Sequence, residues 1–302
     1  MAARFFAGVE LGGTKAIAVL AEGDRIVARE AFATTDDAAA TLAALRATLN
    51  SWRRDTGFLA LGIATFGPVD LARDSAGFGS ILATPKPGWS GAPVARTLTE
   101  GLGRPWRIDT DVNGAALAEH RWGAGIGSDS LCYVTIGTGL GGGLVLGGQP
   151  AHGAMHPEIG HLSLRRAAGD DFAGACPFHG DCVEGLLAGP ALAARFGVDP
   201  ATVPDTHPAW EYAASDLAAL CGAILLTVSA ERILFGGSVA ISRPLLLARA
   251  RTLLVERLGA YLPFLDGETV ERIIQPAGLG ADAGPLGAIA LARDAYAAHA
   301  IG

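Results

Sequence analysis

The sequence has 302 residues, half of them apolar, and a formal net charge of −7. That much apolar material can form one large core or two packed ones, and the acidic balance without a basic run excludes a nucleic-acid-binding surface. No window approaches about 20 uninterrupted apolar residues, and the first residues are too rich in glycine for a signal peptide. We therefore expect a cytoplasmic protein with no membrane span. The four cysteines include two that stand singly in apolar runs, Cys132 and Cys221, which argues against a disulfide framework.

The first third of the chain opens as a strand meander with a glycine-rich first turn. Short β-type runs are expected at 5–11, 16–22 and 25–34, and a helix at 36–52 begins with two aspartates. A buried strand, FLALGIATF, covers 58–66, and a loop rich in Gly and Pro follows at 70–92. The segment RPWRIDTD at 104–111 then predicts a short strand that runs directly into a helix at 112–123.

A second meander repeats this opening. Strands are expected at 131–137 and 143–148, joined by TGLGG, and later at 232–239 and 271–277; helices are expected at 209–230, 243–262 and 283–299. Two copies of strand, glycine turn and strand, each followed by helices, predict a duplicated α/β fold of two lobes with a ligand cleft between them.

Three glycine turns are candidate phosphate sites. They are GGTK at 12–15, GTGLGGG at 137–143 and GGS at 236–238. Backbone N–H groups in such turns point outward, and glycine lets an anion approach them. Each turn alone could be an ordinary hairpin turn. A dinucleotide-binding fingerprint is disfavoured, because GTGLGG lies between two strands instead of opening a helix.

Carboxylates stand at two of the strand ends. Asp111, where a strand meets a helix, is placed to act as a general base in phosphoryl transfer, or it could simply cap the helix. Asn113 could hydrogen-bond a sugar hydroxyl or complete that cap. Glu10, just before the first glycine turn, could hold Mg²⁺ through water or lie solvated at a strand end.

The stretch from His156 to Gly185 contains a compact metal-binding pattern. Cys176, His179 and Cys182 are spaced so that they can surround one Zn²⁺, and His161 is the best candidate for a fourth ligand, with His156 and His152 as competitors. Four protein ligands would make a closed, structural site. The alternative is a reduced cysteine pair beside a solvated histidine.

Long motifs along most of the chain resemble the ROK family (repressor, open reading frame, kinase), and in particular its bacterial fructokinases. They are GVELGGTK (8–15), ATFGPVD (64–70), TPKPGW (84–89), DTDVNGAALAE (109–119), TIGTGLGGG (135–143), HPEIGH (156–161), CPFHGDCVEGLLAGPA (176–191), ILFGGSV (233–239) and GLGADAGPLGAIALA (278–292). Two departures from many ROK glucokinases, Thr110 in place of Asn and CPFHGDC in place of CxCGxxGC, agree with the fructokinase-like branch.

The resemblance implies an actin-like (ribonuclease H-like) fold of two α/β lobes with an interlobe cleft. The lobes would comprise residues 1–112 plus about 286–302, and 113–285 with a zinc-binding loop at 156–185. ATP, Mg²⁺ and a structural Zn²⁺ are the implied cofactors, a hexose is the implied substrate, and a homodimer is the implied assembly.

The resemblance also assigns site residues. Asp111 would be the catalytic base and Glu10 the acid that holds Mg²⁺ through water. Phosphate and nucleotide contacts would come from Gly12, Gly13, Thr14, Lys15, Gly137, Thr138, Gly139, Gly236 and Gly237. The sugar would contact Asn113, Glu158, His161 and Glu184, and zinc would bind His161, Cys176, His179 and Cys182.

The predicted function is transfer of the ATP γ-phosphate to a hexose, with D-fructose as substrate and fructose 6-phosphate as product. Alternatives are a glucokinase or mannokinase of broad specificity, a sugar-responsive repressor and a non-catalytic sugar-binding protein. The repressor would need an N-terminal helix-turn-helix domain, whereas the first strand is expected within about five residues of Met1. A non-catalytic protein is disfavoured by Asp111 together with the glycine turns.

Overall fold

The computed structural model describes residues 4–301, and the chain divides into two compact units. The first unit contains the chain up to Gly123, the segment Gln149–Pro157 and the chain from Ala281 onward. The second contains Ala124–Gly148 and Glu158–Gly280. The sequence-based lobe limits lie elsewhere, at residue 112 and at about 286.

A five-stranded mixed sheet forms the centre of the first unit, in the order β3-β2-β1-β4-β5. Its strands are β1 (Phe5–Leu11), β2 (Lys15–Glu22), β3 (Arg25–Ala33), β4 (Leu61–Thr65) and β5 (Trp106–Thr110). β1 and β2 are antiparallel, as are β2 and β3, whereas β4 lies parallel to β1 and β5 parallel to β4.

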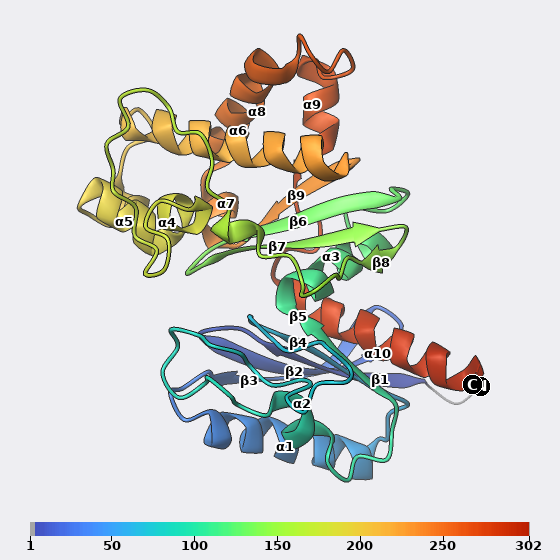
Figure 1. Cartoon of the computed structure of the whole chain (residues 1–302). Helices are drawn as coiled ribbons and strands as arrows, with labels where there is room; N and C mark the ends of the chain where they lie inside the picture. The colour runs from blue at the N-terminus through green and yellow to red at the C-terminus, as the bar shows by residue number, and fades with distance from the viewer. Residues whose placement is uncertain (1–3, 302) are drawn as a thin grey trace. The chain divides into compact units, whose positions relative to one another are not determined.

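Helices cover both faces of this sheet (Figure 1). They are α1 (Ala38–Asp55), α2 (Val94–Thr99), α3 (Asp111–Trp122) and α10 (Ala283–Ile301). Because strand residues alternate between faces, Val9 and Leu11 pack with Leu45 of α1 in one apolar cluster. Phe6 packs with Ile289 of α10 in another cluster, and α3 packs against α10. This packing fixes the helix that starts at Asp111.

The close approach of α3 and α10 requires glycine. A Cβ on Gly287 would lie against the carbonyl of Gly114 and 2.7 Å from the backbone nitrogen of Ala115. Backbone atoms cannot move aside as a flexible side chain can, so we expect Gly287→Ala to lower the free energy of unfolding by about 1–3 kcal/mol. Urea unfolding followed by circular dichroism measures this. Gly267→Ala is the control, because its Cβ would point into open space. Equal stability of both variants would contradict the prediction.

The second unit repeats the arrangement around the strands β10-β9-β6-β7 of the second sheet. These strands are β6 (Ser130–Ile136), β7 (Leu140–Leu146), β9 (Arg232–Gly236) and β10 (Ile274–Pro276). The two-residue strand β8 (Gln149–Pro150) ends this sheet in the strand order and belongs to the segment Gln149–Pro157 of the first unit. As in the first unit, the first two strands are antiparallel and the next two join in parallel. The predicted duplicated α/β fold is thereby confirmed.

The helices of the second unit gather beside this sheet (Figure 1). They are α4 (Val183–Leu187), α5 (Gly189–Phe196), α6 (Ala209–Val228), α7 (Ser238–Ser242), α8 (Pro244–Leu258) and α9 (Gly267–Ile273). Short 3-10 turns lie at Ile159–His161, Pro200–Thr202 and Gly280–Asp282, and the last of these spans the sequence boundary between the units.

One helix of the described residues, α6, is long and apolar enough to cross a membrane by length and composition alone. It packs against α8, and 61% of its apolar window is buried within the protein. These properties are those of a core helix.

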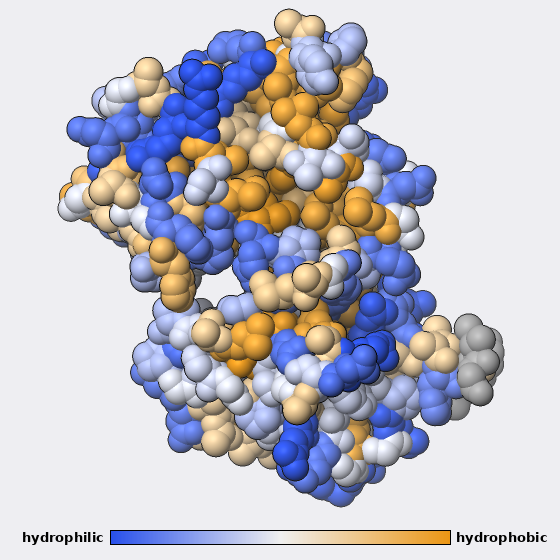
Figure 2. All heavy atoms as spheres, in the orientation of Figure 1, coloured by the Kyte–Doolittle hydropathy of each residue, from blue (hydrophilic) through white to orange (hydrophobic). Residues whose placement is uncertain are grey.

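Figure 2 shows apolar surface where α8 and α9 lie, and Leu245 and Phe264 are exposed apolar side chains of this part of the chain.

Candidate active site

The end of β5 and the start of α3 place Asp111 at a helix N-terminus. Thr110 is the N-cap, and its side-chain oxygen accepts a hydrogen bond from the Asn113 N–H at 3.1 Å. Asp111 is the first residue of the helix and is half-buried. The cap is therefore made by Thr110, which leaves the Asp111 carboxylate for another role.

The Asp111 carboxylate is held at one oxygen. Its Oδ1 accepts a hydrogen bond from the Val112 N–H at 2.9 Å. Burial raises the pKa of Asp111 to about 6, although hydrogen bonds from backbone N–H groups act in the opposite direction. A carboxylate with this pKa is mostly ionised at neutral pH and is a stronger base than an ordinary aspartate.

Asn113 is buried, with an exposed fraction of 1%, and its N–H takes part in the helix cap. Its Nδ2 donates to Oδ1 of Asp109 at 2.8 Å, and this carboxylate fixes the orientation of the amide. Its Oδ1 is buried without a hydrogen-bond partner among the described residues. Asn113 therefore contacts the end of β5 through its Nδ2, and its contact with a sugar stays a prediction.

The first glycine turn joins β1 to β2 beside Glu10. Gly13, Thr14 and Lys15 are exposed, and the Gly12 carbonyl accepts from the Thr34 hydroxyl at 2.8 Å. The pKa of Glu10 is raised to about 7, mainly by burial and further by the negative charge of Asp111. A cation near Glu10 would stabilise the ionised carboxylate against both of these causes. This is the behaviour expected of a carboxylate that takes part in binding Mg²⁺.

The second glycine turn, at Gly137–Gly139, joins β6 to β7 within the second unit. The Gly137 carbonyl accepts from the Gly189 N–H at 2.7 Å, and Thr138 is exposed. Oε2 of Glu184 accepts from the Leu140 N–H at 3.1 Å. The predicted sugar carboxylate at Glu184 thus borders the predicted phosphate turn.

The third glycine pair follows β9 and packs tightly against β6. A Cβ on Gly236 would meet the ring of Tyr133, and one on Gly237 would meet the backbone of Ile136. Gly237 also has a φ of 85°, which favours glycine. Packing alone therefore requires these two glycines, whatever they bind.

The structure brings together the four predicted zinc ligands, His161, Cys176, His179 and Cys182. Sγ of Cys176 lies 3.8 Å from Nδ1 of both histidines, and Sγ of Cys182 lies 3.6 Å from Nδ1 of His161. Tetrahedral zinc with its usual bond lengths separates sulfur and nitrogen ligands by about 3.6 Å. The donor set and spacing fit a zinc ion.

The competing histidines are engaged elsewhere. Nε2 of His152 lies 3.0 Å from Oδ2 of Asp109, and Nε2 of His156 accepts from the Val69 N–H at 3.1 Å. Of the three candidates for the fourth ligand, only His161 lies in the cluster.

Glu158 is exposed and precedes the 3-10 turn Ile159–His161. Its carbonyl accepts from the His161 N–H at 3.0 Å, so the two residues are held on one turn.

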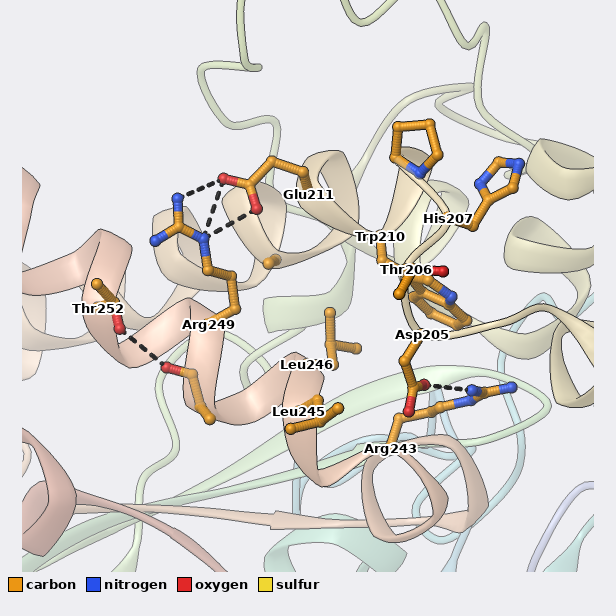
Figure 3. Close-up of a pocket in the computed structure, with 13 residues that line it drawn as sticks. Asp205, Thr206, His207, Trp210, Glu211, Arg243, Leu245, Leu246, Arg249 and Thr252 are labelled. Atoms are coloured by element: carbon orange, nitrogen blue, oxygen red, sulfur yellow. Dashed lines mark hydrogen bonds and ion pairs between the residues drawn. The ribbon is translucent and has the colours of Figure 1, made fainter.

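A cavity of about 570 Å³ lies elsewhere in the second unit, between α6 and α8, and Trp210, Arg243 and Arg249 line it (Figure 3). None of the predicted site residues lines this cavity. The residues that line the cavity come from two separate segments, 205–214 and 243–252, so no single sequence motif indicates it.

The comparisons with known proteins agree on one family. The model of the ROK family matches residues 6–295. A fructokinase of Zymomonas mobilis is 40% identical over 299 residues, with 96% of each chain covered. The crystal structure of a ROK hexokinase from Thermus thermophilus has a TM-score of 0.78 at 29% identity and covers 99% of this chain and 100% of its own. A ROK glucokinase from Streptomyces griseus, in complex with glucose and AMPPNP, has a TM-score of 0.73 at 26% identity, with coverages of 96% and 99%.

Proposed function

This chain belongs to the ROK family, and we propose that it is an ATP-dependent hexose kinase that converts D-fructose to fructose 6-phosphate. The observation that carries the proposal is the placement of Asp111. It is half-buried at the start of α3, with one carboxylate oxygen held by a backbone N–H and a pKa raised to about 6.

Asp111 acts as the general base. It accepts the proton of the attacking sugar hydroxyl while the oxygen of that hydroxyl forms a bond to the γ-phosphorus of ATP. The bond between the γ-phosphorus and the bridging oxygen breaks, and ADP leaves. The bond from Val112 N–H holds one carboxylate oxygen and leaves the other for this proton.

The glycine turns bind the nucleotide. Backbone N–H groups and the exposed side chains of Thr14, Lys15 and Thr138 contact phosphate oxygens, together with Gly12, Gly13, Gly137 and Gly139. Gly236 and Gly237 flank the adenosine. The cavity lined by Arg243, which follows these glycines in the sequence, has room for a planar base. Mg²⁺, held through water at Glu10, would neutralise charge on the phosphates when bound.

Glu158, Glu184 and His161 bind the sugar. Carboxylates accept hydrogen bonds, and a hexose offers many hydroxyl donors. A Zn²⁺ held by the four-residue cluster would fix the ring of His161, because its Nδ1 faces the cysteines and its other nitrogen is left to donate. The zinc is structural in this proposal, since four protein ligands leave it no open position.

Glucose is the second candidate substrate, because a glucokinase of similar fold binds glucose in its crystal structure. Fructose is favoured because the similarity to the Zymomonas mobilis fructokinase is higher, at 40% against 26% identity. We also propose a homodimer, as the family resemblance implies, and a cytoplasmic location, as the sequence leads us to expect.

A coupled assay for ADP tests the substrate assignment. It compares fructose, glucose and mannose at equal concentrations with ATP and Mg²⁺. We expect kcat/KM for fructose to exceed that for glucose by about tenfold or more, which corresponds to about 1.4 kcal/mol of discrimination. Higher kcat/KM for glucose would refute the fructokinase assignment, and ADP release independent of any sugar would refute the kinase.

A further inference from the structure

We propose that His152 is a positioning residue for the strand-to-helix junction that carries Asp111, and that it acts through Asp109. The link to catalysis rests on the proposed function, whereas the effect on the junction itself does not. All the residues involved belong to the first unit.

Asp109 is the hydrogen-bonding centre of this junction. Its side chain is 1% exposed, and its Oδ1 accepts from the Thr110 N–H and from Nδ2 of Asn113, each at 2.8 Å. Thr110 and Asn113 are themselves joined by the helix cap at 3.1 Å. The buried carboxylate therefore holds the backbone of Thr110 and the side chain of Asn113, which lie before and after Asp111 in the chain.

His152 completes the partners of this carboxylate. Its Nε2 lies 3.0 Å from Oδ2 and 3.1 Å from Oδ1 of Asp109. Among the contacts of the described residues, the one from His152 is the contact made to Oδ2 of Asp109. A buried carboxylate oxygen without a donor is costly, so the imidazole N–H stabilises Asp109 in its observed position.

The segment that carries His152 is fastened at a second point. His156 is buried, and its Nε2 accepts from the Val69 N–H at 3.1 Å. Burial lowers the pKa of His156, which favours the neutral ring that this bond requires. With His156 holding the far end, the segment Gln149–Pro157 presents His152 to Asp109 from a fixed backbone instead of a free loop.

The proposal distinguishes a lost hydrogen-bond donor from lost packing. The side chain of His152 is 33% exposed, so its replacement opens no large cavity. His152→Leu removes the donor at similar size, and His152→Gln is the matched control because its amide nitrogen can take the place of Nε2. If His152→Leu proves insoluble, His152→Asn replaces it, because its shorter amide cannot reach Asp109.

Two measurements on the full-length protein test this. In steady-state kinetics with fructose and ATP, we expect His152→Leu to lower kcat by about 10- to 100-fold, as a displaced catalytic group does, while KM for ATP stays within about twofold. His152→Gln should restore most of kcat. In amide hydrogen exchange without ligands, Val112 and Asn113 should exchange faster in His152→Leu than in wild type or His152→Gln.

Wild-type kcat in His152→Leu, or equal losses in both variants, would overturn the proposal. Unchanged exchange at Val112 and Asn113 would overturn it as well. If the wild type phosphorylates no hexose, the proposed function fails, and the exchange measurement still decides whether His152 fixes the junction.

Discussion

Asp111→Asn is expected to lower kcat for hexose phosphorylation by about 10³-fold, within the range that a general base contributes. Asparagine keeps the size of the side chain and can still accept from the Val112 N–H, but it cannot take a proton from the sugar. The Kd for the sugar, measured by isothermal titration calorimetry, should change little, because binding does not require the proton transfer. Thermal unfolding provides the control for folding.

The pH profile gives an independent test of the same residue. The pKa of Asp111 is raised to about 6 by burial, and only its ionised form can act as a base. With Mg²⁺ in excess, which keeps Glu10 ionised, we expect wild-type kcat/KM to be constant near neutral pH and to fall about tenfold per pH unit below about pH 6. This acidic limb should be missing from the residual activity of Asp111→Asn. Activity of the variant near that of the wild type would remove Asp111 from the base role.

Loss of zinc is expected to have the second-largest effect. Purified protein should contain about one zinc ion per chain, measured by inductively coupled plasma mass spectrometry. Cys182→Ser should abolish that content and lower the Tm by roughly 5–10 °C, because Cys182 is a buried thiol and its loss removes one of four ligands.

Cys221→Ala is the matched control for this experiment. Cys221 is also buried, but it lies in α6, outside the metal cluster. Its substitution should leave the zinc content unchanged. Zinc-free wild-type protein with full activity and full stability would contradict the structural zinc site.

Local patterns predict the meanders and the cluster of cysteines and histidines. The runs around Gly12 and Gly139 alternate between strand and turn signals, and their pairing follows from chain proximity. Cys176, His179 and Cys182 lie so close in sequence that one loop brings them together. His161 lies fifteen residues before Cys176, and it is the best candidate for a fourth ligand because HPEIGH ends in a turn and the loop after it can fold back. The structure confirms that His161 joins the cluster.

Contacts between distant segments could not be predicted in this way. The bond between Asp109 and His152 joins a strand end to a segment 43 positions later, and neither residue carries a local signal for it. The same holds for Glu184 and the Leu140 N–H, which are 44 positions apart. The sequence pattern also does not indicate the short helix α9. The strand predicted at 271–277 begins within this helix, and only Ile274–Pro276 pair with β9.

The burial of Asn113 shows a further limit of sequence patterns. Its spacing from Asp111 does not indicate that its amide nitrogen donates to Asp109. Only the three-dimensional course of β5 into α3 decides which of the polar residues in DTDVN faces outward.

Identification of the reaction product tests the central claim most directly. The wild-type protein is incubated with D-fructose, ATP and Mg²⁺, and the products are identified by ³¹P nuclear magnetic resonance. The proposed function predicts that fructose 6-phosphate and ADP appear in equal amounts. ADP with inorganic phosphate and no sugar phosphate would contradict it.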